Sequence, residues 1–227
     1  GCHQEGISGE AATLAGHLGL GKLIALYDDN HITIDGNTEV SFTEDVMKRY
    51  EAYGWHVQHV ADGNTDVDGI QKAIEAAKAV TDRPSLIKVT TTIGYGSPNK
   101  SNTAGVHGAP LGEEEANLTR EALGWEYGPF EIPQESYDHW RQAIDRGAAA
   151  EEAWNATLAS YRNNYATEAA LFERMLRGEL PEGWEACLPS FSPEDKGLAT
   201  RQYSQNCLNA IAPHLPELIG GSADLTH

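Results

Sequence analysis

The first residues that could bind a ligand or take part in chemistry form a polar turn, Asp28-Asp29-Asn30-His31-Ile32. The turn directly follows residues 23–27, a continuous apolar run typical of a strand buried on both faces. Ligands of open α/β sheets bind beyond the carboxyl ends of such strands, and an Asn side-chain oxygen with a neighbouring main-chain carbonyl suits Mg²⁺. Asp and Asn also favour ordinary turns, so the pattern alone leaves both interpretations open.

Three other residues have the chemistry to hold a phosphate or move a proton. Gly1 precedes a helical pattern, where a glycine lets backbone N–H groups approach an anion, although a lone glycine is also common in turns. His107 is flanked by glycines at 105 and 108, and is either a proton carrier facing a cavity or an exposed loop histidine. Arg201 begins a later helix and is either a phosphate fork or a surface ion-pair partner.

The remaining polar clusters favour plainer interpretations. The other histidines show no ligand spacing and are expected to be surface or packed residues; they are His3, His17, His56, His59, His139 and His214. The acidic run Glu113-Glu114-Glu115 lies in the first turn of an expected helix, and we interpret it as a solvated face.

Apolar periodicity predicts the elements that position these residues. Helical spacing alternates with short strand-like runs, in the order helix, strand, helix, strand, helix, strand. The segments are residues 5–19, 23–27, 43–53, 55–60, 66–80 and 84–89. This alternation predicts an α/β fold, a parallel sheet with helices on both faces.

The rest of the chain divides by composition. Residues 90–110 are rich in Gly, Ser, Asn and Thr, and so long a loop in a compact domain is usually functional. Helices are expected at residues 112–123, 135–177 and 197–212, with a Pro-containing stretch at 178–193 and a short strand at 218–219. We therefore expect an α/β domain over residues 1–125, a helical and Pro-rich linker over 126–194, and the beginning of a second α/β domain over 195–227.

Composition excludes several classes of protein. Among 227 residues, 40% are apolar and five are Trp, enough for a packed core. The net charge of −18 opposes binding to nucleic acid or anionic membranes, so any phosphate site must be built locally. The three cysteines form no C-x-x-C pair, which favours a reducing compartment over secretion. No signal or transit-like stretch is present, and both ends interrupt recognisable patterns, so we interpret the sequence as an internal fragment.

In their residues and their order, these motifs resemble those of the transketolase family along the whole chain, most closely its plant and cyanobacterial branch. The resemblance rests on Gly1-Cys2 with Gln4-Glu5-Gly6-Ile7-Ser8, on Tyr27-Asp28-Asp29-Asn30-His31-Ile32-Thr33-Ile34-Asp35-Gly36, on Thr90-Thr91-Thr92-Ile93-Gly94-Tyr95-Gly96-Ser97, on Val106-His107-Gly108-Ala109-Pro110, on Ala199-Thr200-Arg201 and on Gly220-Gly221-Ser222-Ala223-Asp224-Leu225-Thr226.

The resemblance implies a site for thiamine diphosphate and Mg²⁺, with Ca²⁺ as a substitute ion. Gly1 matches the second glycine of the family's Gly-Asp-Gly…Asn motif, and 28 residues (2 to 29) separate it from Asn30. Asn30 would bind the metal through its side chain and Ile32 through its carbonyl. The metal-binding Asp of that motif would precede Gly1.

The resemblance also implies the other roles. His107 would be catalytic, at the diphosphate and the bound sugar, and Arg201 would hold the substrate phosphate. Glu5 would lie near the cofactor where two subunits of a homodimer meet. The implied reaction moves a two-carbon ketol unit from a ketose phosphate to an aldose phosphate, in the pentose phosphate pathway or the Calvin cycle, in the cytoplasm or chloroplast stroma. Because the motif's Asp and a proton-relay Glu fall outside these residues, we expect the chain alone to be inactive.

Two alternatives remain open. The first is another thiamine-diphosphate enzyme of similar architecture, such as dihydroxyacetone synthase or deoxyxylulose-phosphate synthase; the motif wording disfavours the latter. The second is a non-catalytic fragment that uses its acidic helices, residues 112–177, as an interaction surface.

Overall fold

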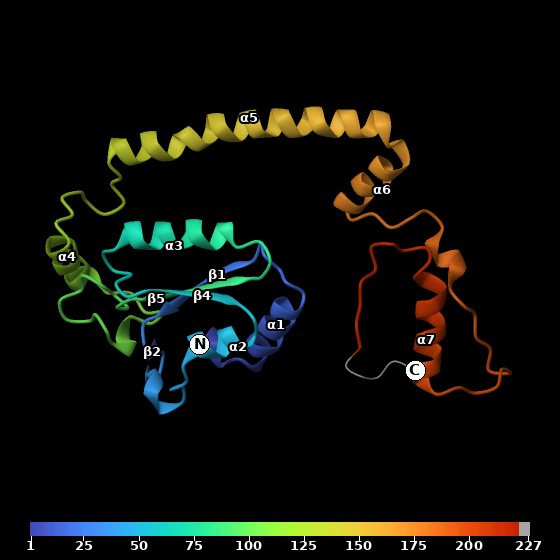
Figure 1. Cartoon of the computed structure of the whole chain (residues 1–227), viewed down its shortest axis with the longest axis horizontal. Helices are drawn as coiled ribbons and strands as arrows, with labels where there is room; N and C mark the ends of the chain where they lie inside the picture. Colours follow the sequence, from blue (N-terminus) through green and yellow to red (C-terminus); the bar gives the residue numbers. More distant parts are fainter. Residues whose placement is uncertain (223–227) are drawn as a thin grey trace. The chain divides into compact units, whose positions relative to one another are not determined.

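The computed structural model describes residues 1–222 (Figure 1). It contains two compact units, the first spanning Gly1–Glu131 and the second starting at Ile132. Among the described residues, none of the helices has the length and apolarity needed to cross a membrane.

The first unit is built on a parallel sheet of three strands, which confirms the predicted fold class. The strands are β1 (Ile24–Asp29), β4 (His56–Val60) and β5 (Ser85–Thr90), in the order β1-β5-β4. Packed helices cover both faces of the central strand β5, and its successive residues Leu86 and Ile87 are each at most 1% exposed.

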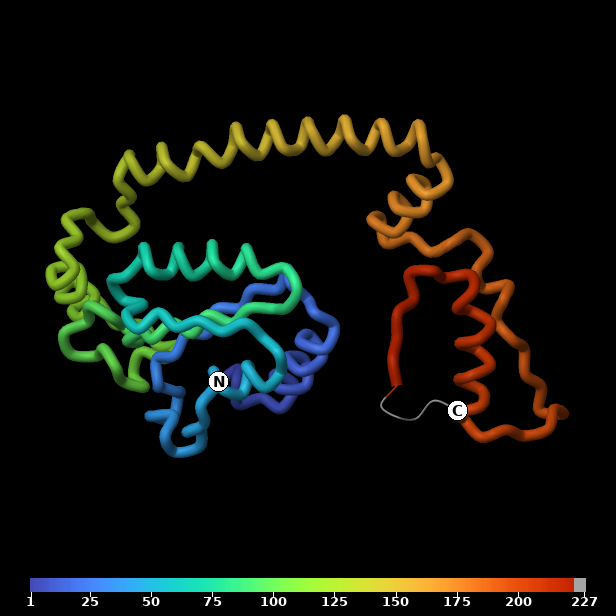
Figure 2. The backbone as a smooth tube through the Cα atoms, in the orientation of Figure 1, coloured from blue at the N-terminus to red at the C-terminus, as the bar shows by residue number. Residues whose placement is uncertain are grey.

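Helices cover both faces of this sheet (Figures 1 and 2). On one face α1 (Gly6–His17) and α2 (Val46–Ala52) pack with Leu86, and the Trp55 indole donates a hydrogen bond to the Ala12 carbonyl at 2.8 Å. On the other face α3 (Val67–Ala79) packs Ala73 and Ala77 against Ile87. The two cores meet at β5 because alternate residues of a strand point to opposite faces.

Side chains in the connections define where helices begin. Asp45 and Asp66 are N-caps of α2 and α3, accepting hydrogen bonds from the N–H groups of Lys48 and Gly69 at 3.2 and 2.8 Å. After β1 the chain forms a small antiparallel hairpin, β2 (Ile32–Thr33) and β3 (Gly36–Asn37), which the sequence analysis did not predict. After β5 a long segment leads through a 3₁₀ turn, η3 (Ala104–Val106), to α4 (Glu113–Ala122).

The second unit consists of helices. They are α5 (Gln134–Asn164), α6 (Ala166–Leu176) and α7 (Thr200–Ile211), with a 3₁₀ turn η4 (Trp184–Cys187) between α6 and α7. The predicted helical stretch 135–177 is thus two helices, and an ion pair between Arg162 and Glu173 joins them. The division of this region into linker and second domain stays a prediction.

The strand predicted at residues 218–219 does not form, which is a correction. Leu218 instead donates its N–H to the Leu215 carbonyl at 2.9 Å within a turn. A strand needs a partner for its backbone groups, and within residues 1–222 none pairs with this segment.

Candidate functional site

Four of the predicted cofactor residues line one cavity of about 90 Å³ beyond the carboxyl end of β1. They are Gly1, Asn30, Ile32 and His107. They come from three separate segments: the start of the chain, the turn after β1, and the segment of residues 90–110 after β5, here called the Gly-rich segment. The parallel sheet explains this convergence, because β1 and β5 are neighbours and end at the same edge.

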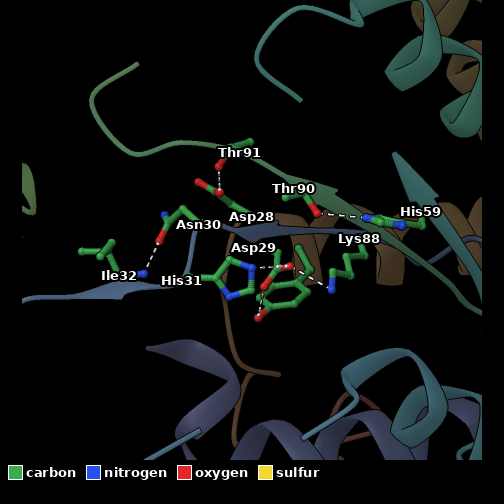
Figure 3. A network of polar contacts seen from close by, with 10 residues as sticks. Asp28, Asp29, Asn30, His31, Ile32, His59, Lys88, Thr90 and Thr91 are labelled. Atoms are coloured by element: carbon green, nitrogen blue, oxygen red, sulfur yellow. Dashed lines mark hydrogen bonds and ion pairs between the residues drawn. The ribbon is translucent and has the colours of Figure 1, made fainter. Parts of the chain in front are cut away.

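The turn after β1 is shaped by the Asn30 side chain, as Figure 3 shows. Its Oδ1 accepts a hydrogen bond from the Ile32 N–H at 3.0 Å. An amide oxygen has two acceptor directions, so one remains for another donor or a cation. Between these residues His31 has a φ of 60°, in the left-handed region that few side chains adopt without support.

The His31 side chain contacts Asp29, a carboxylate only 5% exposed. Its Oδ2 lies 2.8 Å from the Lys88 ammonium and 3.4 Å from His31 Nε2, and its Oδ1 accepts the Tyr27 hydroxyl at 3.0 Å. Burial acts to raise the pKa of Asp29, but Lys88, Tyr27 and His31 together outweigh it and hold that pKa below its usual value. Burial and the nearby Asp29 charge raise the pKa of Tyr27.

Two further residues line the same cavity, to which the sequence analysis gave no individual role: Asp28, named only as part of the polar turn, and His3, expected to be a surface or packed residue. Asp28 lines the cavity and accepts a hydrogen bond from the Thr91 hydroxyl. His3 also lines it, half-buried with its ring 4.2 Å from the Tyr27 ring. Burial lowers the pKa of His3, and Arg49 lowers it further. The sequence held one indication for His3, which lies two residues after the candidate Gly1. Judging the histidines by metal-ligand spacing did not use this closeness.

The segment that carries His107 is fixed by a buried glutamate. Glu115, 6% exposed, accepts hydrogen bonds from the Ser97 hydroxyl and from both the N–H and the side-chain amide of Asn99, the last two at 2.9 Å. These bonds lower the pKa of Glu115. This corrects the expectation that the whole acidic run 113–115 is a solvated face, because Glu115 points inward on α4. His107 itself is exposed at the end of η3.

The two other predicted site residues do not line this cavity. Glu5 is exposed and precedes α1 as its N-cap residue, without a side-chain capping bond. Arg201 belongs to the second unit, where it is exposed in the first turn of α7. The roles expected for both stay predictions.

The donor set fits a hard cation only in part. Within residues 1–222 no group of three or more His, Cys, Asp or Glu side chains could hold a metal ion. Asn30 and Ile32 offer two oxygens, whereas Mg²⁺ takes six in an octahedron and commonly completes them with phosphate and water. These residues therefore fit an ion that arrives with a diphosphate.

The fold and the cavity define an α/β domain with a cavity at the carboxyl edge of a parallel sheet, the edge at which open α/β sheets bind their ligands. The family model described as "Transketolase, thiamine diphosphate binding domain" matches residues 1–181. The chain therefore belongs to the transketolase family.

Individual relatives agree with this assignment. A transketolase from Nostoc sp. is 66% identical over all of this chain and 34% of its own length. A chloroplastic transketolase from Arabidopsis thaliana is 57% identical over 99% of the chain and 30% of its own length. A crystal structure of Pichia stipitis transketolase in complex with sedoheptulose-7-phosphate superposes with a TM-score of 0.90 at 46% identity, covering 99% of this chain and 33% of that one. The chain thus spans about a third of the length of these relatives.

Proposed function

We propose that the full-length protein is a transketolase. It transfers a two-carbon ketol unit from a ketose phosphate to an aldose phosphate, using thiamine diphosphate and Mg²⁺, with Ca²⁺ as a substitute ion. The observation that supports this most is the cavity where Gly1, Asn30, Ile32 and His107 converge from three segments. When bound, thiamine diphosphate supplies the nucleophilic carbon and the electron sink for carbon–carbon bond cleavage.

In this proposal the chain's residues bind and orient the cofactor. The Asn30 Oδ1 and the Ile32 carbonyl hold the metal, which neutralises diphosphate charge in a molecule whose net charge is −18. Gly1 precedes a 3₁₀ turn and then α1, and a glycine there lets backbone N–H groups approach a phosphate. His107 is the group that exchanges a proton or hydrogen bond with the sugar.

The remaining assignments concern parts of the protein beyond this cavity. Arg201 holds the substrate phosphate, and Glu5 lies near the cofactor where two subunits of a homodimer meet. Chloroplastic and cyanobacterial relatives support a location in the stroma or the cytoplasm. The acidic surface disfavours nucleic acid and anionic membranes as partners.

The test is calorimetric titration of Mg²⁺–thiamine diphosphate into the full-length protein. We expect Asn30→Ala to abolish or strongly weaken binding, because it removes a metal ligand. The matched control is Asn155→Ala, an exposed position on α5 where the same change should leave binding unaltered. Equal binding by the parent and Asn30→Ala would show that Asn30 is only a turn residue.

Acceptor profiling distinguishes transketolase from dihydroxyacetone synthase. We expect pentose phosphates to be used in preference to formaldehyde. The isolated 227-residue chain should transfer no ketol unit, and transfer by that purified chain would contradict our placement of essential groups outside it.

A further inference from the structure

A charge cluster surrounds the buried Asp29 carboxylate, next to the turn that carries Asn30 and Ile32, here called the metal turn. Asp29 and Lys88 form it with Tyr27 and His31, and none of the four was assigned a role by the sequence or by the proposed function. Strand geometry brings three of them together. Tyr27 and Asp29 lie two apart on β1, so they share a face of the sheet, and Lys88 on β5 is paired with Tyr27 on β1. The sheet therefore brings Tyr27, Asp29 and Lys88 together, and His31 joins them from the turn.

Asp29 connects this rigid sheet to the turn. On the sheet side it is held by the Lys88 ammonium at 2.8 Å and the Tyr27 hydroxyl at 3.0 Å. On the turn side it reaches His31 Nε2 at 3.4 Å, as Figure 3 shows. The contact joins Asp29 and His31, the two sequence neighbours of Asn30, which is the residue proposed to bind the metal.

The backbone on either side of Asn30 is fixed as well. The Asp29 carbonyl accepts the Thr91 N–H at 3.3 Å, and the His31 carbonyl accepts the Thr38 N–H at 2.9 Å. These two bonds leave the left-handed conformation of His31 to be explained. Its side chain is 58% exposed and contacts Asp29. A non-glycine residue keeps this conformation only where its surroundings determine it.

We propose that Asp29 is a positioning residue for the metal site. Its carboxylate, anchored by Lys88 and Tyr27, holds His31 in the left-handed conformation and thereby aims the Asn30 amide and the Ile32 carbonyl into the cavity. The inference rests on the proposed function, because it assigns the support of the same metal turn. Asp29 does not itself touch the cofactor in this role.

The experiment measures the Mg²⁺ concentration that half-saturates thiamine diphosphate binding to the full-length protein. Asp29→Asn keeps the shape and removes the charge, and we expect it to raise this concentration by about tenfold, the usual effect of losing a group that orients a metal ligand. Binding at saturating Mg²⁺ should recover, because the ligands themselves remain. A half-saturating concentration equal to that of the parent would overturn the proposal.

His31 supplies a second pair of variants on an exposed side chain, where folding is least at risk. His31→Ala loses the contact with Asp29 but keeps the cost of a positive φ, so it should raise the Mg²⁺ requirement. His31→Gly adopts that φ freely and should recover part of the loss. If Asp29→Asn fails to fold, the two His31 variants decide the question. An unchanged Mg²⁺ requirement in His31→Ala would then overturn the proposal. A role confined to stability would lower the melting temperature without changing the Mg²⁺ requirement.

The proposed function fails by a different outcome. If Asn30→Ala binds Mg²⁺–thiamine diphosphate as well as the parent does, the metal turn itself is misassigned. If Asn30→Ala loses binding while Asp29→Asn and His31→Ala match the parent, the metal turn stands and only the role of Asp29 is wrong.

Discussion

Two segments leave the carboxyl ends of neighbouring strands in the first unit, and each is fixed by one buried carboxylate. After β1, Asp29 fixes a turn of a few residues; after β5, Glu115 reaches back from α4 to fix the long Gly-rich segment. The two carboxylates are almost equally buried, at 5% and 6% exposed. Their partners differ: Asp29 is paired with the Lys88 ammonium, whereas the hydrogen bonds to Glu115 come from the neutral groups of Ser97 and Asn99.

The difference shows two ways of keeping a buried charge. The positive charge of Lys88 compensates the desolvation of the Asp29 carboxylate. Removing either partner leaves the other without its counter-charge. Glu115 is compensated mainly by hydrogen bonds from neutral groups, with the charge of Lys100 as the smallest contribution, and a neutral acceptor of the same shape could replace it. The comparison predicts that removing charge disrupts the β1 turn more than the Gly-rich segment.

The largest effect should come from Lys88→Met. It leaves Asp29 buried without its cation, and we expect a loss of about 3 kcal/mol in the free energy of unfolding. Urea denaturation of the chain measures it. Lys72→Met is the control, because Lys72 is exposed on α3, and there the change should be close to neutral. Equal stability of the two variants would show that the Asp29 ion pair contributes nothing.

Glu115→Ala should come next, at about 2 kcal/mol, because it leaves the buried Ser97 hydroxyl and the donors of Asn99 without an acceptor. Hydrogen exchange should show faster opening of residues 97–100. Glu114→Ala changes the same helix turn at an exposed position and serves as the control. Protection of residues 97–100 unchanged in Glu115→Ala would contradict the role of this carboxylate.

Part of this arrangement was open to prediction from the sequence. Apolar runs and their order predicted the parallel sheet, and the polar turn after β1 was expected at its carboxyl edge. Strand alternation also places Asp28 and Asp29 on opposite faces. The pairing of β1 with β5, which brings Lys88 to Asp29, depends on tertiary packing and has no local signal.

Glu115 shows the same limit more sharply. It stands in a run of three glutamates, and local composition gives no reason to single out one of them. Its burial depends on how α4 docks onto the Gly-rich segment, at Ser97 and Asn99. The hairpin β2–β3 was missed for a related reason: its two-residue strands are too short to show any period.

Acidification should weaken the β1 turn, by less than either substitution above. The pKa of Asp29 in the folded protein lies below the value of about 3.9 for an unfolded Asp. Its contribution to stability is therefore complete above that unfolded value and is lost as the pH falls through the folded pKa. The stability difference between the parent and Asp29→Asn, measured by urea denaturation from pH 7 down, should shrink below about pH 4. A difference independent of pH would show that the carboxylate's charge is not what stabilises the turn.

The smallest effect, and the sharpest test of the comparison, is Glu115→Gln. The Gln oxygen keeps the bonds from Ser97 and from the Asn99 N–H, and the Asn99 amide can rotate to face the new NH₂ group. We expect a loss of about 0.5–1 kcal/mol, the scale of one weakened hydrogen bond. Asp29→Asn should cost clearly more, because no rotation supplies Lys88 with a charge. Urea denaturation of both variants beside the parent compares them directly. If Glu115→Gln costs as much as Asp29→Asn, the charge of Glu115 matters too, and the distinction between an ion-paired and a neutrally solvated carboxylate fails for this protein.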